Sequence, residues 1–150
     1  MSPKEIDKKT IEKLLPHREP MLLIDELKNI KKLFSATAIV NVKKNSFFVQ
    51  GHSPGQPVMP GVLIVEAFGQ AAAALTAAGI DKKEYDNKLV FLMTVDKARF
   101  RSPVIPDCRL ELNIEAIRSH GRVWKYKGEA FVNGKKMADA QWSATIVDRK

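Results

Sequence analysis

Two residues in the middle of the chain, His52 and Glu66, have side chains suited to acid–base chemistry. His52 opens a loop rich in proline and glycine, and Glu66 lies early in the apolar segment that follows. A histidine can act as a base near neutral pH. A carboxyl among neighbours such as Val62, Leu63 and Phe68 loses hydration, which favours its protonated form. The pair can therefore supply one base and one acid.

Three further residues extend this arrangement. Gln70 follows Glu66 by four positions, so on a helix the two share a face and the amide can orient the carboxyl. Gly61 and Val62 begin the apolar segment. Free backbone N–H groups and the positive end of the helix dipole can stabilise a carbonyl oxygen as it becomes negative. The pattern predicts removal of a proton next to a carbonyl group.

Simpler explanations exist for each residue alone. A buried glutamate is often paired with a cation, and a histidine in a Gly/Pro loop is often a turn residue. The other histidines, His17 and His120, are scattered and Cys108 is the single cysteine, so we expect no metal. The chain has no Gly-rich phosphate loop followed by Lys and Ser/Thr, and no G-x-S-x-G elbow. We expect no cofactor.

An apolar helix over residues 62–78, capped by Gly79, must position these groups. It is too short and too interrupted for a comfortable membrane span, and a helix apolar on all sides needs enclosure. We predict an α+β fold, an antiparallel sheet wrapped around one long central helix, in a single domain over residues 1–150. The other expected elements are a short helix ending at Pro16, strands at 21–30, 34–42, 88–101, 109–117, 123–132 and 137–147, and hairpin turns at 119–121 and 133–134.

The chain is basic, with 25 Lys plus Arg against 17 Asp plus Glu and a net charge of +8. This charge favours an acidic partner, which could be nucleic acid, an anionic membrane face or an acidic carrier protein, or it gives only a soluble surface. Lys97, Arg99 and Arg101 alternate along one expected strand and are candidates for contacting an anion. The single cysteine and the lack of a signal-peptide pattern favour a cytoplasmic location.

A long motif connects the loop to the helix: Gly51-His52-Ser53-Pro54-Gly55-Gln56-Pro57-Val58-Met59-Pro60-Gly61-Val62-Leu63-Ile64-Val65-Glu66-Ala67, followed by Gln70. With Leu14-Leu15-Pro16-His17-Arg18 and Asp96-Lys97-Ala98-Arg99-Phe100, it makes the sequence resemble the FabZ-type (3R)-hydroxyacyl-[acyl-carrier-protein] dehydratases, which have a hot-dog fold. The resemblance spans nearly the whole chain.

The resemblance implies a role for each matching residue. His52 is then the catalytic histidine and Glu66 the catalytic carboxylate. The Gly61 N–H polarises the thioester carbonyl, and Gln70 supports the acid. Phe91 matches an aromatic residue that gates the acyl tunnel. Glutamate at position 66 points away from the related FabA branch.

The implied reaction is loss of water from a 3-hydroxyacyl thioester to give the trans-2-enoyl thioester, without a cofactor. The implied partners are acyl carrier protein and a second copy of the chain, as a homodimer or a trimer of dimers with shared sites. The implied processes are fatty acid and lipid A biosynthesis. Two departures from the family pattern are Ser53, where an aromatic residue is expected, and Asp107-Cys108 in place of Gly-Asp.

Three alternatives stay open at this point. A thioesterase of the same fold would need a water aimed at the thioester carbonyl. A nucleic-acid-binding module needs exposed aromatic residues, whereas Trp124, Tyr126 and Trp142 occupy alternating positions that favour the core. A non-catalytic acyl-carrier-binding protein would not require both His52 and Glu66. We expect neither nucleic-acid binding nor membrane insertion.

Overall fold

The structure is a computed structural model that describes residues 4–48, 55–80 and 88–148. Its described elements, in chain order, are α1 (Lys8–Leu14), β1 (Glu26–Lys31), β2 (Ser35–Val42), α3 (Gly61–Gly79), β3 (Lys88–Phe100), β4 (Cys108–His120), β5 (Val123–Val132) and β6 (Lys135–Asp148).

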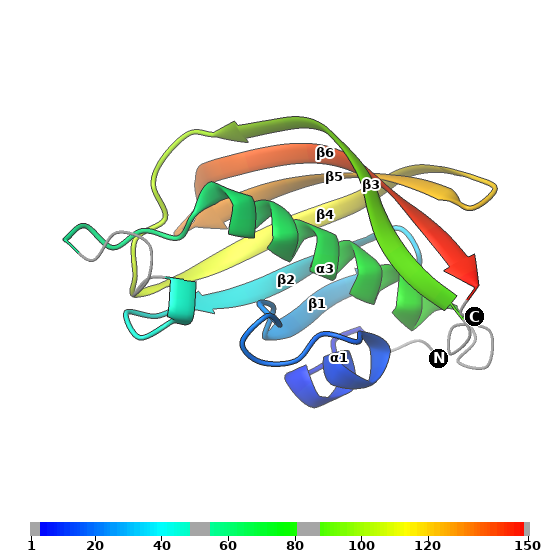
Figure 1. Cartoon of the computed structure of the whole chain (residues 1–150), viewed down its shortest axis with the longest axis horizontal. Coiled ribbons are helices and arrows are strands. Elements are labelled where there is room, and N and C mark those ends of the chain that lie inside the picture. Colours follow the sequence, from blue (N-terminus) through cyan, green and yellow to red (C-terminus); the bar gives the residue numbers. More distant parts are fainter. Residues whose placement is uncertain (1–3, 49–54, 81–87, 149–150) are drawn as a thin grey trace.

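The strands form one antiparallel sheet in the order β1-β2-β4-β5-β6-β3. Figure 1 shows α3 lying along the inside of the curved sheet, with α1 near the β1 edge of the sheet. Helix α1 contacts α3 there. This strand order places β3, the next described element after α3, at one edge of the sheet. This is the hot-dog architecture, and the predicted α+β fold class is confirmed.

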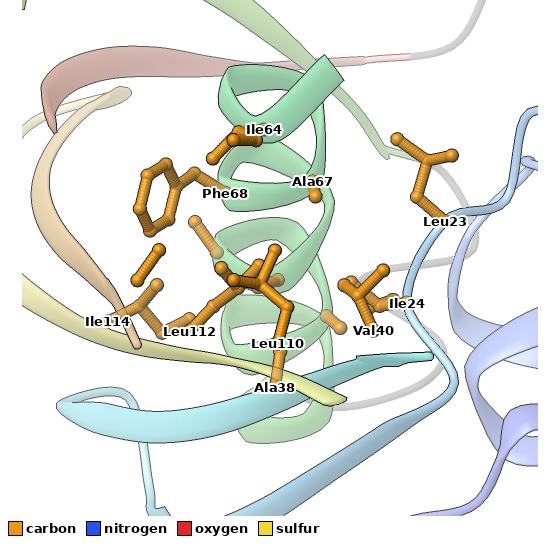
Figure 2. Close-up of a cluster of buried hydrophobic side chains, with 14 of the residues drawn as sticks. Leu23, Ile24, Ala38, Val40, Ile64, Ala67, Phe68, Leu110, Leu112 and Ile114 are labelled. Atoms are coloured by element: carbon orange, nitrogen blue, oxygen red, sulfur yellow. The ribbon is translucent and has the colours of Figure 1, made fainter. Parts of the chain in front are cut away.

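Helix α3 is the centre of the core. Its buried residues are mainly small, so the sheet can approach closely: Ile64, Ala67, Phe68, Gln70, Ala71, Ala72, Ala73, Ala74, Leu75, Thr76 and Ala77. Figure 2 shows Ile64, Ala67 and Phe68 among side chains from β2 and β4, including Ala38, Leu110 and Leu112. By length and hydropathy α3 could cross a membrane, but 61% of its most apolar 18-residue stretch is buried inside the fold. It is a core helix.

Apolar and polar residues alternate along the strands, so that the apolar side chains form the face of the sheet that packs against α3. Leu110, Leu112 and Ile114 of β4 are buried, with polar residues between them. On β5 and β6, Tyr126 and Trp142 stack at 5.9 Å between ring centroids, and Trp142 stacks on Phe68 at 5.3 Å. These aromatic rings face the core, as predicted, so they do not form a surface for stacking nucleic-acid bases.

The prediction of a strand over residues 21–30 is wrong in its first half, because β1 begins at Glu26. Leu22, Leu23 and Ile24 are buried but are not in the sheet. The Leu23 N–H donates to the Gln70 side chain at 2.8 Å instead of to a neighbouring strand. An apolar run that looked like a strand is thus a buried connection fastened to α3.

Gly79 was expected to cap α3, but it is the last helical residue and Ile80 is the C-cap. A Cβ on Gly79 would lie 2.5 Å from Leu33 Cδ2, so glycine is needed there for close packing. The turn at Asn133-Gly134 is confirmed, with φ of 49° and 80°. The other hairpin turns one residue later than expected, because His120 still pairs with Val123.

Candidate active site

Glu66 lies near the start of α3 and is held by Gln70, one turn further along. Gln70 Nε2 donates to Glu66 Oε2 at 2.8 Å and to the Met21 carbonyl oxygen at 2.7 Å, while its Oε1 accepts from Leu23 N–H at 2.8 Å. Gln70 is buried, whereas the Glu66 side chain keeps 36% exposure. The Glu66 carboxyl is therefore fixed by its hydrogen bond to Gln70 and is still accessible to a substrate.

His17 also reaches this carboxyl, from the connection that follows α1. Its Nε2 lies 3.7 Å from Glu66 Oε2. The sequence pattern predicts no role for His17, although this residue stands within the Leu14–Arg18 segment that carries part of the resemblance. The sequence feature that could have pointed to His17 is that segment itself. His17 lies outside the predicted helices and strands, so packing within an element does not explain it.

The N-terminus of α3 offers unbonded donors. Pro60 is the N-cap and makes no side-chain cap, and its carbonyl oxygen accepts from Leu63 and Ile64. The N–H groups of Gly61 and Val62 make no hydrogen bond within the part of the chain that is described. They can hold a developing negative oxygen, and the helix dipole adds to this effect.

Gly61 is also packed closely by β3. A Cβ on Gly61 would lie 2.9 Å from the Phe100 ring. Because a side chain at position 61 would displace that ring, the close approach of Phe100 to the helix N-terminus depends on glycine. Val62, next to it, is 76% exposed and free to contact another molecule.

A cavity of about 90 Å³ lies beside Glu66, between α3 and strands β3, β5 and β6. A Cβ on Gly69 would meet no atom within 4 Å, so glycine keeps this wall open. The indole Nε1 of Trp142 is buried without a hydrogen-bond partner among the described residues. The lining is Glu66 with mostly small and apolar residues: His17, Val65, Gly69, Gln70, Ala72, Ala73, Val90, Leu92, Tyr126, Trp142 and Ala144.

Comparison with known proteins decides the family. Residues 15–141 match the family model of the FabA-like domain. The chain belongs to the FabA-like family. Two similar relatives are proteins named 3-hydroxyacyl-[acyl-carrier-protein] dehydratase FabZ. The one from Anaeromyxobacter sp. (strain K) is 46% identical, with 93% of this chain and 90% of the relative covered. The one from Myxococcus xanthus (strain DK1622) is 50% identical, with 91% and 88% covered.

These relatives support the FabZ type within the FabA-like family, as the resemblance implied. A solved structure, the dehydratase heterocomplex ApeI:P from Xenorhabdus doucetiae, matches with a TM-score of 0.77 and 17% identity. It covers 92% of this chain and 91% of that chain. At this identity the likeness supports the fold.

Two site candidates of this FabA-like chain remain, His52 and Phe91. His52 and Ser53 lie outside the described residues. Phe91 is 51% exposed on β3, and the neighbouring Val90 and Leu92 line the cavity instead. Within residues 4–48, 55–80 and 88–148, no three His, Cys, Asp or Glu side chains gather where they could hold a metal ion.

Cys108 is not suited to be a nucleophile. Burial, and then the charge of Asp107, raises the pKa of the Cys108 thiol. The thiol stays protonated near neutral pH, and the thiolate is the reactive form. Asp107 itself accepts a hydrogen bond from the Lys44 N–H at 2.9 Å, so this departure from the family pattern connects the start of β4 to the segment after β2.

Proposed function

We propose that this FabZ-type protein is a 3-hydroxyacyl-[acyl-carrier-protein] dehydratase, a hydro-lyase of fatty acid biosynthesis. The observation that carries the proposal is the Glu66 carboxyl, fixed by Gln70 and opening onto an apolar cavity. The names of the relatives at 46% and 50% identity support the same reaction. A fixed carboxyl beside an apolar wall is suited to protonate a leaving group on an acyl chain.

The proposed reaction converts a (3R)-3-hydroxyacyl thioester into the trans-2-enoyl thioester. His52 removes a proton from C2, and the N–H groups of Gly61 and Val62 stabilise the thioester oxygen as it becomes enolate-like. Glu66 donates a proton to the 3-hydroxyl, which leaves as water while the C2–C3 double bond forms. Afterwards His52 loses its proton and Glu66 regains one, so no cofactor is consumed.

A homodimer, or a trimer of such dimers, is part of the proposal. The edge strand β3 exposes large apolar side chains, with 51% of Phe91, 52% of Leu92 and 43% of Val95 exposed. An apolar edge strand in a single chain is prone to pair with another chain. A second copy on this edge would cover Phe91, which then gates the acyl tunnel from the interface, and would bring His52 of one chain toward Glu66 of the other.

The shared site can be tested by mixing two inactive variants, His52→Ala and Glu66→Gln, after unfolding and refolding them together. A mixed dimer would hold one doubly damaged site and one intact site, so random pairing should restore roughly a quarter of wild-type sites. No recovery in a mixture shown to contain mixed dimers would reject the shared site and leave the chemistry in place.

Acyl carrier protein is the proposed second partner. It would contact basic side chains on and just after β3. Lys97 and Arg99 are exposed on the strand, and Arg101, the residue that follows it, donates from Nε to Asp139 Oδ2 at 2.8 Å. We place the protein in the cytoplasm as a single domain over residues 1–150, serving fatty acid synthesis and lipid A synthesis. The net charge of +8 fits an acidic carrier.

The test is to incubate the protein with a 3-hydroxyacyl thioester of acyl carrier protein and to follow two signals. Enoyl thioester absorbance reports loss of water, and free thiol reports hydrolysis. We expect absorbance to rise without thiol release. Thiol release without enoyl absorbance would overturn the proposal in favour of a thioesterase, and binding without either signal would indicate a non-catalytic carrier-binding protein.

A further inference from the structure

The two oxygens of the Glu66 carboxyl have different surroundings. Oε2 has Gln70 Nε2 at 2.8 Å and His17 Nε2 at 3.7 Å. Oε1 has no hydrogen-bond donor among the residues that the structure describes. One oxygen is therefore surrounded by protein nitrogens, and the other is left for a substrate.

Gln70 must present a hydrogen, and not a lone pair, to Oε2. Its own Oε1 accepts from the Leu23 N–H, and its Nε2 also donates to the Met21 carbonyl oxygen. Because both backbone partners have a fixed polarity, the amide cannot be turned around. Oε2 is thus an acceptor, and the proton of the protonated carboxyl belongs on Oε1.

His17 can present a second hydrogen to the same oxygen. Its Nδ1 is buried and has no partner among the described residues, whereas its Nε2 has the Glu66 carboxylate oxygen within reach. The ring hydrogen is more stable on the nitrogen that has an acceptor. A separation of 3.7 Å is too long for a direct hydrogen bond. A small rotation of the ring would close it, and catalytic hydrogen bonds often tighten when substrate binds.

The connection that carries His17 is held in place on both sides. Arg18 Nη1 donates to the carbonyl oxygens of Leu15 at 2.9 Å and His17 at 2.7 Å. Further along, Met21 and Leu23 bond to the Gln70 side chain. His17 therefore approaches Glu66 from a segment that is fastened to α3 itself, which keeps the imidazole in place before substrate arrives.

We propose that His17 is a positioning residue for Glu66. Together with Gln70 it occupies Oε2, so that the acid proton stays on Oε1, the oxygen that faces the leaving hydroxyl. The mechanism above does not use His17, and the inference rests on the proposed dehydratase function.

Three variants test this role. His17→Leu should lower kcat by about 10- to 100-fold, the scale expected when a reacting group is misplaced, with KM and Tm unchanged. His17→Gln should recover most of kcat, because its amide nitrogen can reach the position of Nε2. His120→Ala is the matched control, since His120 is exposed at the end of β4, and it should keep wild-type kcat.

Wild-type kcat in His17→Leu would overturn the proposal. The proposal would also be overturned if His17→Gln and His17→Leu lowered kcat equally and both lowered Tm. That result would indicate a structural role alone. Nitrogen NMR of the His17 ring gives a readout independent of turnover. We expect the hydrogen on Nε2 and a signal that shifts in Glu66→Gln. An inactive wild type would reject the dehydratase function, whereas an unshifted signal would reject the role of His17, whether or not the wild type is active.

Discussion

Gln70 Nε2 donates a hydrogen bond to Glu66 Oε2 at 2.8 Å, and the same amide is held on its other side by the backbone of residues 21–23. The N-terminal connection and the central helix are thus joined at the candidate acid. Any change at Gln70 should affect stability and activity together, because one buried side chain serves both.

The first prediction concerns Gln70→Leu. The variant removes all three hydrogen bonds and leaves the buried Leu23 N–H unpaired, so the free energy of unfolding should fall by about 2–3 kcal/mol. Urea unfolding measures this. Gln141→Leu, on the half-buried face of β6, is the control and should stay within about 0.5 kcal/mol of wild type. Equal midpoints for the two variants would contradict the account.

Gly69→Ala should stabilise the protein and narrow its cavity. The new Cβ would meet no atom within 4 Å, and replacing glycine by alanine inside a helix stabilises by about 0.5–1 kcal/mol. Because Gly69 lines the cavity beside Glu66, turnover of longer acyl chains should decrease while Tm rises. Gly128→Ala is the contrasting variant and should lower Tm, because its Cβ would lie 2.6 Å from the Phe68 ring. A lower Tm for Gly69→Ala would show that the wall is not open.

The sequence predicts those parts of the fold in which one local pattern decides the outcome. Alternation at Leu110, Leu112 and Ile114 and the apolar run of α3 identify the sheet and its central helix. The pattern at Leu22–Ile24 predicts a strand wrongly, because the hydrogen-bond partner of this segment is the Gln70 side chain, which a local pattern does not contain. His17 was missed for the same reason: its contact with Glu66 depends on the path of the chain in three dimensions.

Alkaline pH should destabilise the protein through Tyr126. Burial raises the pKa of Tyr126 to about 12, whereas an unfolded tyrosine titrates near 10. Stability from the neutral phenol is therefore complete below pH of about 10 and is lost as pH rises toward about 12, because the unfolded state releases its proton first. Tyr126→Phe should show a weaker decrease in unfolding free energy across that interval, measured with urea. An unchanged pH dependence would contradict the assignment.

Tyr126→Phe should also be less stable than wild type near pH 8. The Tyr126 hydroxyl and Thr76 Oγ1 are 2.5 Å apart in the core, so the substitution leaves the Thr76 hydroxyl without this partner, at a cost of about 1 kcal/mol. Adding Thr76→Val should recover part of that loss. A double variant no more stable than the single one would show that the hydrogen bond is not the cause.

Charge on β3 should affect the use of carrier-linked substrate. Removing Lys97 and Arg99, which are exposed, should raise KM for a thioester on acyl carrier protein and leave KM for a small thioester unchanged. Wild-type KM for the carrier-linked substrate should also rise with salt, because screening shortens the reach of exposed charges to about 8 Å at physiological ionic strength. Lys135→Ala, at the start of β6, is the control. A salt-independent KM would exclude docking through these charges.

The most direct test of the account is the turnover of Glu66→Gln and of His52→Ala, followed by enoyl thioester absorbance. Glutamine keeps the size of Glu66, whose side chain is 36% exposed, so Tm should stay close to wild type. A general acid or base contributes about 10²- to 10⁴-fold to rate, and each variant should lose kcat on that scale. Near wild-type turnover in either folded variant would contradict the assignment of Glu66 as the acid or His52 as the base.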